Sequence, residues 1–239
     1  MDTIKVNRGK TKLIAHRGVS GLECENTSAA FVAAGNRSYF GIETDVHVTS
    51  DGKFAVIHDD HTGRVSDVDI GVETSTYDEL GKIALYDMEK GRYRSDLVIP
   101  QLCEYIRICK RYEKTAVLEL KNPMTAEKIA EIVEIIKKEE YLYQTIFISF
   151  DWNNLVQIRK NSPNQKVQFL TGKWDDSLYE RLKEAAFDLD IQYESLTQEI
   201  IENLHREGIE VNCWTCNDKT AAQTLISWGI DYITSNILE

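Results

Sequence analysis

Along most of the chain, apolar residues recur with one of two periods. In some segments every second residue is apolar, as in a strand, and in others the period is close to the 3.6 residues of a helical turn. Short runs of the first kind are each followed by a stretch of the second kind. In residues 125–141, for example, Ile129, Ile132 and Ile136 fall on one face of a helix. Strands that alternate with helices in this way predict a parallel sheet wrapped by helices.

Eight segments have the pattern of core strands. They are residues 12–16, 41–46, 116–121, 145–150, 166–172, 186–192, 210–215 and 231–235. Helices are predicted over residues 28–35, 100–112, 125–141, 152–161, 177–185, 198–208 and 219–229. Eight parallel strands can close into a cylinder, so the predicted fold class is α/β, a (β/α)8 TIM barrel. Gly35 is the predicted C-cap of the first helix.

A hairpin follows the second of these strands. Residues 50–53, Ser-Asp-Gly-Lys, predict a two-residue type I′ turn, so the chain should return antiparallel beside the strand. Counting outward from this turn pairs Val48 with Ala55 and Asp45 with His58.

Residues 59–98 show no sustained period and are rich in Gly, Asp, Ser and Thr. We interpret them as a segment inserted after the second barrel strand, with a short helix near residues 76–82, inside a single domain of residues 1–239. Insertions of this length in compact domains are usually lids or recognition surfaces.

Composition narrows the classes of partner. The chain of 239 residues has a formal net charge of −11, which argues against binding to nucleic acid or to an anionic membrane. No run approaches the roughly 18 apolar residues of a membrane span, so stable membrane insertion is not expected. The opening residues lack a signal-peptide pattern and five scattered cysteines form no disulfide framework, so a cytoplasmic location is expected. A small molecule is therefore the expected partner, and the sequence leaves open whether the protein forms a homodimer.

The candidate catalytic and metal-binding residues lie at or near the ends of predicted strands, where the catalytic groups of such barrels are found. Glu43, Asp45 and His47 alternate along one strand and should share a face. Glu119 and Lys121 end another strand. Three carboxylates form a hard-oxygen site suited to Mg²⁺ or Ca²⁺ rather than to zinc. Taken singly, each of these residues could equally face water or form a surface salt bridge.

Asn26 and Thr27 precede the first predicted helix. Either could be its N-cap, and for Asn26 that capping role is as well supported as a functional one. His61 and His205 are expected at the surface, and Trp152, Trp174 and Trp228 are expected to pack helices onto the barrel.

The motifs IAHRG, ENT, IETDV, TSDG, VIHDD, LELK, ISF and WTCN together resemble the glycerophosphodiester phosphodiesterase family, within the phosphatidylinositol-phospholipase-C-like barrels. The resemblance runs in order through nearly the whole chain. It implies catalytic roles for His16 and His58, metal binding by Glu43, Asp45 and Glu119, substrate binding by Arg17, Lys121 and Trp214, and supporting roles for Glu25, Asn26 and Phe150. His47 shares the face of Glu43 and Asp45, and a structural or supporting role is expected for it rather than direct chemistry. The chain departs from the family pattern at Cys24, at Gln101 and in its closing residues 234–238.

The resemblance implies metal-dependent hydrolysis of a glycerophosphodiester to glycerol 3-phosphate and an alcohol, with one histidine as base and the other as acid. Two alternatives stay open. One is a phospholipase-D-like enzyme acting on lysophospholipids or sphingolipids, and the other is a non-catalytic barrel that binds a phosphorylated ligand. The sequence does not decide the alcohol, the ion, the first base, or whether a cyclic phosphate forms first.

Overall fold

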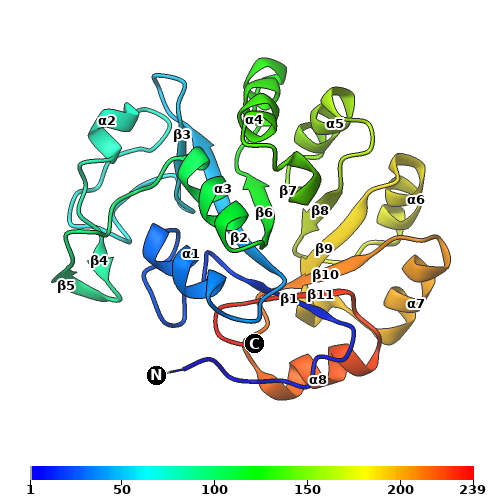
Figure 1. The fold of residues 1–239 in the computed structure, drawn as a ribbon. Coiled ribbons are helices and arrows are strands. Elements are labelled where there is room, and N and C mark those ends of the chain that lie inside the picture. The colour runs from blue at the N-terminus through cyan, green and yellow to red at the C-terminus, as the bar shows by residue number, and fades with distance from the viewer. Residues whose placement is uncertain (1) are drawn as a thin grey trace.

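Eight parallel strands close on themselves in the computed structural model, which describes residues 2–239 (Figure 1). They are β1 (Lys12–Ala15), β2 (Gly41–Val48), β6 (Thr115–Leu120), β7 (Thr145–Ser149), β8 (Val167–Thr171), β9 (Asp188–Gln192), β10 (Val211–Trp214) and β11 (Tyr232–Ser235). Strand β1 pairs in parallel with both β11 and β2, and this closes the cylinder. The predicted barrel and its eight strands are confirmed.

A ring of helices surrounds these strands (Figure 1). The helices are α1 (Ser28–Gly35), α3 (Leu102–Arg111), α4 (Ala126–Lys138), α5 (Trp152–Asn161), α6 (Asp176–Ala185), α7 (Gln198–Arg206) and α8 (Lys219–Ser227), with short 3-10 turns at Leu142–Gln144 and Tyr193–Ser195. Most begin at a Thr or Asp whose side chain accepts a backbone N–H bond, a cap worth about 1 kcal/mol. The apolar face of α4 is buried against the barrel, as its spacing predicts.

Gly35 does not act as the predicted left-handed cap. It is the last residue of α1, and the C-cap is Asn36, whose φ is −78°. A Cβ on Gly35 would lie 2.5 Å from Cγ of the Tyr112 ring. The glycine is therefore needed for close packing against an aromatic ring, which sequence pattern alone does not distinguish from capping.

The hairpin forms, but its predicted register is wrong by one residue. Strand β3 (Phe54–Val56) pairs antiparallel with β2, and its partners are Val56 with Val46 and Ala55 with His47. The turn has three residues, 50–52, with Gly52 at a φ of +76°, and the Thr49 N–H donates to the Lys53 carbonyl at 2.9 Å. Asp45 therefore does not pair with His58, which lies beyond the end of β3.

The segment 59–98 extends to one side of the barrel (cyan in Figure 1). It contains the predicted short helix, α2 (Tyr77–Leu80), and a small hairpin of β4 (Tyr86–Asp87) and β5 (Glu89–Tyr93). A separate apolar cluster holds it in place and includes Ile57, Val72, Leu80, Leu85 and Leu97. A lid or recognition role for this segment stays a prediction. Within residues 2–239, no helix has the length and apolar character needed to cross a membrane.

Candidate functional site

A cavity of about 190 Å³ opens where the barrel strands end. Seven of the site residues expected from the sequence line it, namely His16, Arg17, Glu43, His58, Glu119, Phe150 and Trp214. Its remaining walls were not foreseen and are Ile148, Leu170, Asp190, Thr215 and Thr234. Segments far apart in the sequence thus meet around one small cavity.

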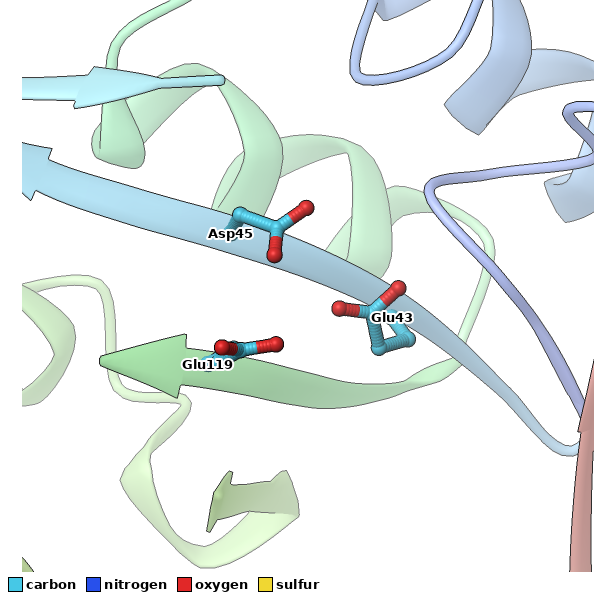
Figure 2. Close-up of side chains that lie close together, drawn as sticks. All are labelled: Glu43, Asp45 and Glu119. Carbon is cyan, nitrogen blue, oxygen red and sulfur yellow. The ribbon is translucent and has the colours of Figure 1, made fainter. Parts of the chain in front are cut away.

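Three carboxylates on β2 and β6 lie close together (Figure 2), and two of them, Glu43 and Glu119, line this cavity. Glu43 and Asp45 project from the same face of β2, and Glu119 stands on β6 at the position that pairs with Asp45. One oxygen from each lies within 4.8 Å of the others. All three side chains are buried, with exposed fractions of 2%, 1% and 8%. Among residues 2–239 this is the one group of acidic, His or Cys side chains spaced to hold a metal ion.

The electrostatics of the trio favour a bound cation. Burial and the charge of Asp45 raise the pKa of Glu43 well above its usual range and that of Glu119 to about 7. Burial would also raise the pKa of Asp45, but the charges of Lys121 and Arg17 outweigh it and hold this pKa well below its usual range. Oδ1 of Asp45 is buried without a hydrogen-bond partner. A divalent cation would stabilise all three carboxylates and satisfy that oxygen.

Two cations flank the trio. Nζ of Lys121 lies 2.8 Å from Oε1 of Glu119 and 3.5 Å from Oδ1 of Asp45. Nε of Arg17 lies 3.6 Å from Oδ2 of Asp45. The Arg17 backbone, with a φ of 53°, turns its N–H onto Oε2 of Glu43 at 2.8 Å. Both side chains are therefore held beside the carboxylates of the trio by charge pairing.

His16 is oriented by a residue that the sequence analysis missed. Its Nδ1 lies 2.6 Å from Oδ1 of Asn236, so Nδ1 donates the hydrogen bond and Nε2 is left for the cavity, 4.0 Å from Oε2 of Glu43. Burial and the charge of Arg17 lower the pKa of His16 to about 4. The one signal for Asn236 was the departure of residues 234–238 from the family pattern.

His58 is held through a chain of ion pairs. Its Nδ1 lies 2.6 Å from Oδ1 of Asp59, and Arg64 donates to the other oxygen of Asp59. Burial lowers the pKa of His58, although the nearby charge of Asp45 opposes this effect. Arg64 also contacts Glu25, which in turn accepts a bond from Arg17 at 2.9 Å. No sequence pattern pointed to Arg64.

Asn26 and Thr27 have separate roles. Thr27 is the N-cap of α1, and its side chain accepts a hydrogen bond from the N–H of Ala30. Asn26 donates to Oδ2 of Asp45 at 2.8 Å and accepts from the Thr44 hydroxyl at 2.7 Å. Asn26 is therefore free to orient a carboxylate of the trio because its neighbour caps the helix.

His47 and Phe150 lie at the edge of the site. His47 is fully buried; its Nδ1 is 3.0 Å from Glu73 and its Nε2 is 3.2 Å from the His58 carbonyl, so it supports His58 from behind and does not line the cavity. Phe150 packs edge-on against Trp214, with ring centroids 5.7 Å apart. The indole Nε1 of Trp214 is buried without a partner.

Cys213 and Cys216 are buried free thiols, and His61 is 67% exposed. His61 is therefore a surface residue, as expected.

Comparison with known proteins gives consistent findings. The model of the glycerophosphoryl diester phosphodiesterase family matches residues 16–238. A glycerophosphodiester phosphodiesterase from Caldanaerobacter subterraneus is 29% identical over 95% of this chain and 94% of its own, and one from Bacillus altitudinis is 28% identical over 93% of each. The solved structure of a phosphodiesterase from Oleispira antarctica in complex with sn-glycerol-3-phosphate is 27% identical, covers 98% of this chain and 96% of that one, and has a TM-score of 0.85.

Proposed function

The chain belongs to the glycerophosphoryl diester phosphodiesterase family, and from the geometry of its site we propose which residues carry out hydrolysis of the phosphodiester bond. The protein hydrolyses glycerophosphodiesters to glycerol 3-phosphate and an alcohol. The observation that carries the proposal is the convergence of Glu43, Asp45 and Glu119 beside two oriented histidines, at one end of a closed barrel.

Glu43, Asp45 and Glu119 would hold one Mg²⁺ or Ca²⁺, because three carboxylates with room for further oxygen ligands suit either ion. When bound, the ion supplies a Lewis acid that polarises the phosphoryl oxygens. Asn26 keeps Asp45 oriented, and the Arg17 N–H does the same for Glu43.

Arg17 and Lys121 bind the phosphoryl group and neutralise the charge that develops on its oxygens, a contribution that is often the largest in catalysis. Both are paired with carboxylates of the site, at 3.6 Å for Arg17 to Asp45 and 2.8 Å for Lys121 to Glu119. Their positions are therefore set before the substrate arrives, and little reorganisation is needed.

His16 and His58 transfer the protons. In both, Nδ1 is engaged by an acceptor, Asn236 or Asp59, which leaves Nε2 for proton transfer. One histidine accepts a proton from the nucleophile and the other donates one to the leaving alkoxide, each step being worth roughly 10²–10⁴ in rate. Burial lowers the pKa of both rings in the substrate-free protein, and an anionic phosphoryl group beside them would raise it.

The size of the cavity favours a small substrate. Its volume of about 190 Å³ is below the roughly 300–1,000 Å³ of sites that enclose drug-sized ligands. A lysophospholipid would have to leave its acyl chain outside. Val68, Met88, Tyr93 and Val98 expose apolar surface in the inserted segment, but none of them lines the cavity, and single exposed apolar residues are common on protein surfaces.

A coupled assay for the released products tests the proposal. Purified protein is given glycerophosphocholine or lysophosphatidylcholine, with and without a chelator, and glycerol 3-phosphate, lysophosphatidate and choline are measured. We expect glycerol 3-phosphate from glycerophosphocholine and loss of this activity with the chelator. Faster release of choline from lysophosphatidylcholine would favour the lipid-cleaving alternative. Binding of glycerol 3-phosphate without turnover of either substrate would leave a non-catalytic barrel.

A further inference from the structure

A polar layer crosses the barrel interior at the floor of the cavity. Gln168, Asp190, Asn212 and Thr234 come from β8, β9, β10 and β11, and each is at most 2% exposed. Nδ2 of Asn212 donates to Oε1 of Gln168 at 3.3 Å, and the Thr234 hydroxyl donates to Oδ1 of Asn212 at 3.3 Å. Asp190 pairs in register with Asn212 and lines the cavity itself.

Asp190 is left without a full set of partners. Its Oδ1 is buried and accepts no hydrogen bond, and no Lys, Arg or His among residues 2–239 forms an ion pair with it. Two donors in this region also lack partners, Nε2 of Gln168 and Nε1 of Trp214, the latter on a residue that lines the cavity. Buried polar groups without partners are rare in folded proteins, so the unpartnered groups of Asp190 and Trp214, which both line the cavity, point to a ligand that completes them.

The chemistry of the floor fits a hydroxyl group better than an ammonium group. Asp190 has an unpartnered carboxyl oxygen and no cationic partner among residues 2–239, and burial raises the pKa of this carboxyl well above its usual range, which favours the form that both donates and accepts a hydrogen bond. An ammonium group would need an ionised carboxylate instead. The adjoining walls, Ile148 and Leu170, are apolar and leave the carboxyl as the polar contact on that side.

We propose that Asp190 forms, with Trp214, a subsite at the floor of the cavity that binds the hydroxyl groups of the glyceryl part of the substrate. This inference rests on the proposed function, because it assumes that a phosphoryl group lies at Arg17 and Lys121. The glyceryl part is common to all glycerophosphodiesters, and therefore suits the fixed walls made by barrel strands. The alcohol varies between substrates, and the open mouth beside the inserted segment can accommodate it.

Binding of the product to Asp190→Leu tests the subsite. The probes are glycerol 3-phosphate and inorganic phosphate, measured by calorimetry on the wild-type protein, Asp190→Leu and Asp190→Asn with the same divalent cation. We expect Asp190→Leu to weaken glycerol 3-phosphate about tenfold to a hundredfold and to leave inorganic phosphate within about threefold, because only the hydroxyl contacts are lost. Asp190→Asn keeps a donor and an acceptor and should stay close to wild type.

Kinetics separate this inference from the proposed function. The kcat/KM of Asp190→Leu should fall by a similar factor for glycerophosphocholine, glycerophosphoethanolamine and glycerophosphoglycerol, since all share the glyceryl part. An equal loss of affinity for both probes, a loss confined to one alcohol, or no loss would overturn the subsite. If the wild type cleaves none of these diesters, the proposed function fails, whereas the comparison of the two binding probes still decides the subsite.

If Asp190→Leu does not fold, a crystal structure of the wild-type protein with glycerol 3-phosphate tests the subsite instead. A glyceryl hydroxyl within about 2.5–3.0 Å of the Asp190 carboxyl is expected. A glyceryl group directed out of the cavity would overturn the proposal.

Discussion

Arg64 binds Glu25 with both of its terminal nitrogens, at 2.9 and 2.7 Å. The pairing joins the inserted segment to the barrel, because Glu25 also accepts a bond from Arg17 at 2.9 Å. Arg64 additionally donates to Asp59, the partner of His58. One guanidinium therefore connects the surroundings of a phosphate-binding arginine with those of a histidine that transfers protons.

Replacement of Arg64 tests this connection. We expect Arg64→Met to lower kcat by about tenfold to a hundredfold, because small displacements of reacting groups are costly. The thermal midpoint should change little, since the Arg64 side chain is 46% exposed. Arg92→Met is the matched control, with a side chain 69% exposed and its Nε 3.4 Å from Asp87. Equal rates for the two variants would show that Arg64 does not position the site.

Removal of either histidine should abolish most of the turnover. His16→Ala or His58→Ala is expected to lower kcat by at least about a hundredfold without unfolding the protein, because each ring carries one proton transfer. His61→Ala is the control, since that side chain is 67% exposed. Steady-state rates and circular dichroism measure both effects. Near-normal turnover in either of the first two variants would refute the assigned role.

Asn236 is expected to act through His16. In Asn236→Leu the ring loses the acceptor that fixes the proton on Nδ1, so kcat should fall about tenfold or more while KM changes little. Asn236→Asp keeps an acceptor at the same position and should raise the pKa of His16, because it places a negative charge next to the ring. The limb of the rate profile that reports His16, acidic if it is the base and basic if it is the acid, should then move to higher pH. An unchanged profile would contradict the contact.

Metal binding should depend on pH. The pKa of Glu119 is raised to about 7 from an ordinary value of 4.5. Between these two pH values the folded metal-free protein keeps a proton that the unfolded chain has released. Stability of the metal-free protein therefore falls as the pH rises from about 4.5 to 7. A cation replaces that proton, so Mg²⁺ or Ca²⁺ should raise the thermal midpoint more at about pH 8 than at about pH 5.5. A larger gain at the lower pH would be inconsistent with this linkage.

The sequence pattern predicted the barrel well because strands and helices of this fold differ clearly in period, as α4 shows with its buried Ile129 and Ile132. The sequence pattern gave a wrong prediction where the length of one turn or one contact between distant segments determined the local structure. Ser50-Asp51-Gly52 forms a three-residue turn, so the register of β3 moved by one position. Gly35 is required by the ring of Tyr112, a contact between distant segments that no local pattern contains.

The carboxylate trio could be predicted because Glu43 and Asp45 alternate on a strand and Glu119 ends another. Asn236, Arg64 and Asp190 could not be predicted in the same way. Arg64 and Asn236 contact residues that are distant in the sequence, and Asp190 stands out only because its buried oxygen lacks a partner in the folded protein.

The central claim is that one cation lies among Glu43, Asp45 and Glu119, and anomalous diffraction tests it most directly. Crystals soaked in Mn²⁺, which accepts the same oxygen ligands as Mg²⁺, would be measured near the manganese edge. The account predicts a single strong peak within about 2.0–2.6 Å of one oxygen from each of the three side chains. A peak elsewhere, or none at saturating Mn²⁺, would contradict it.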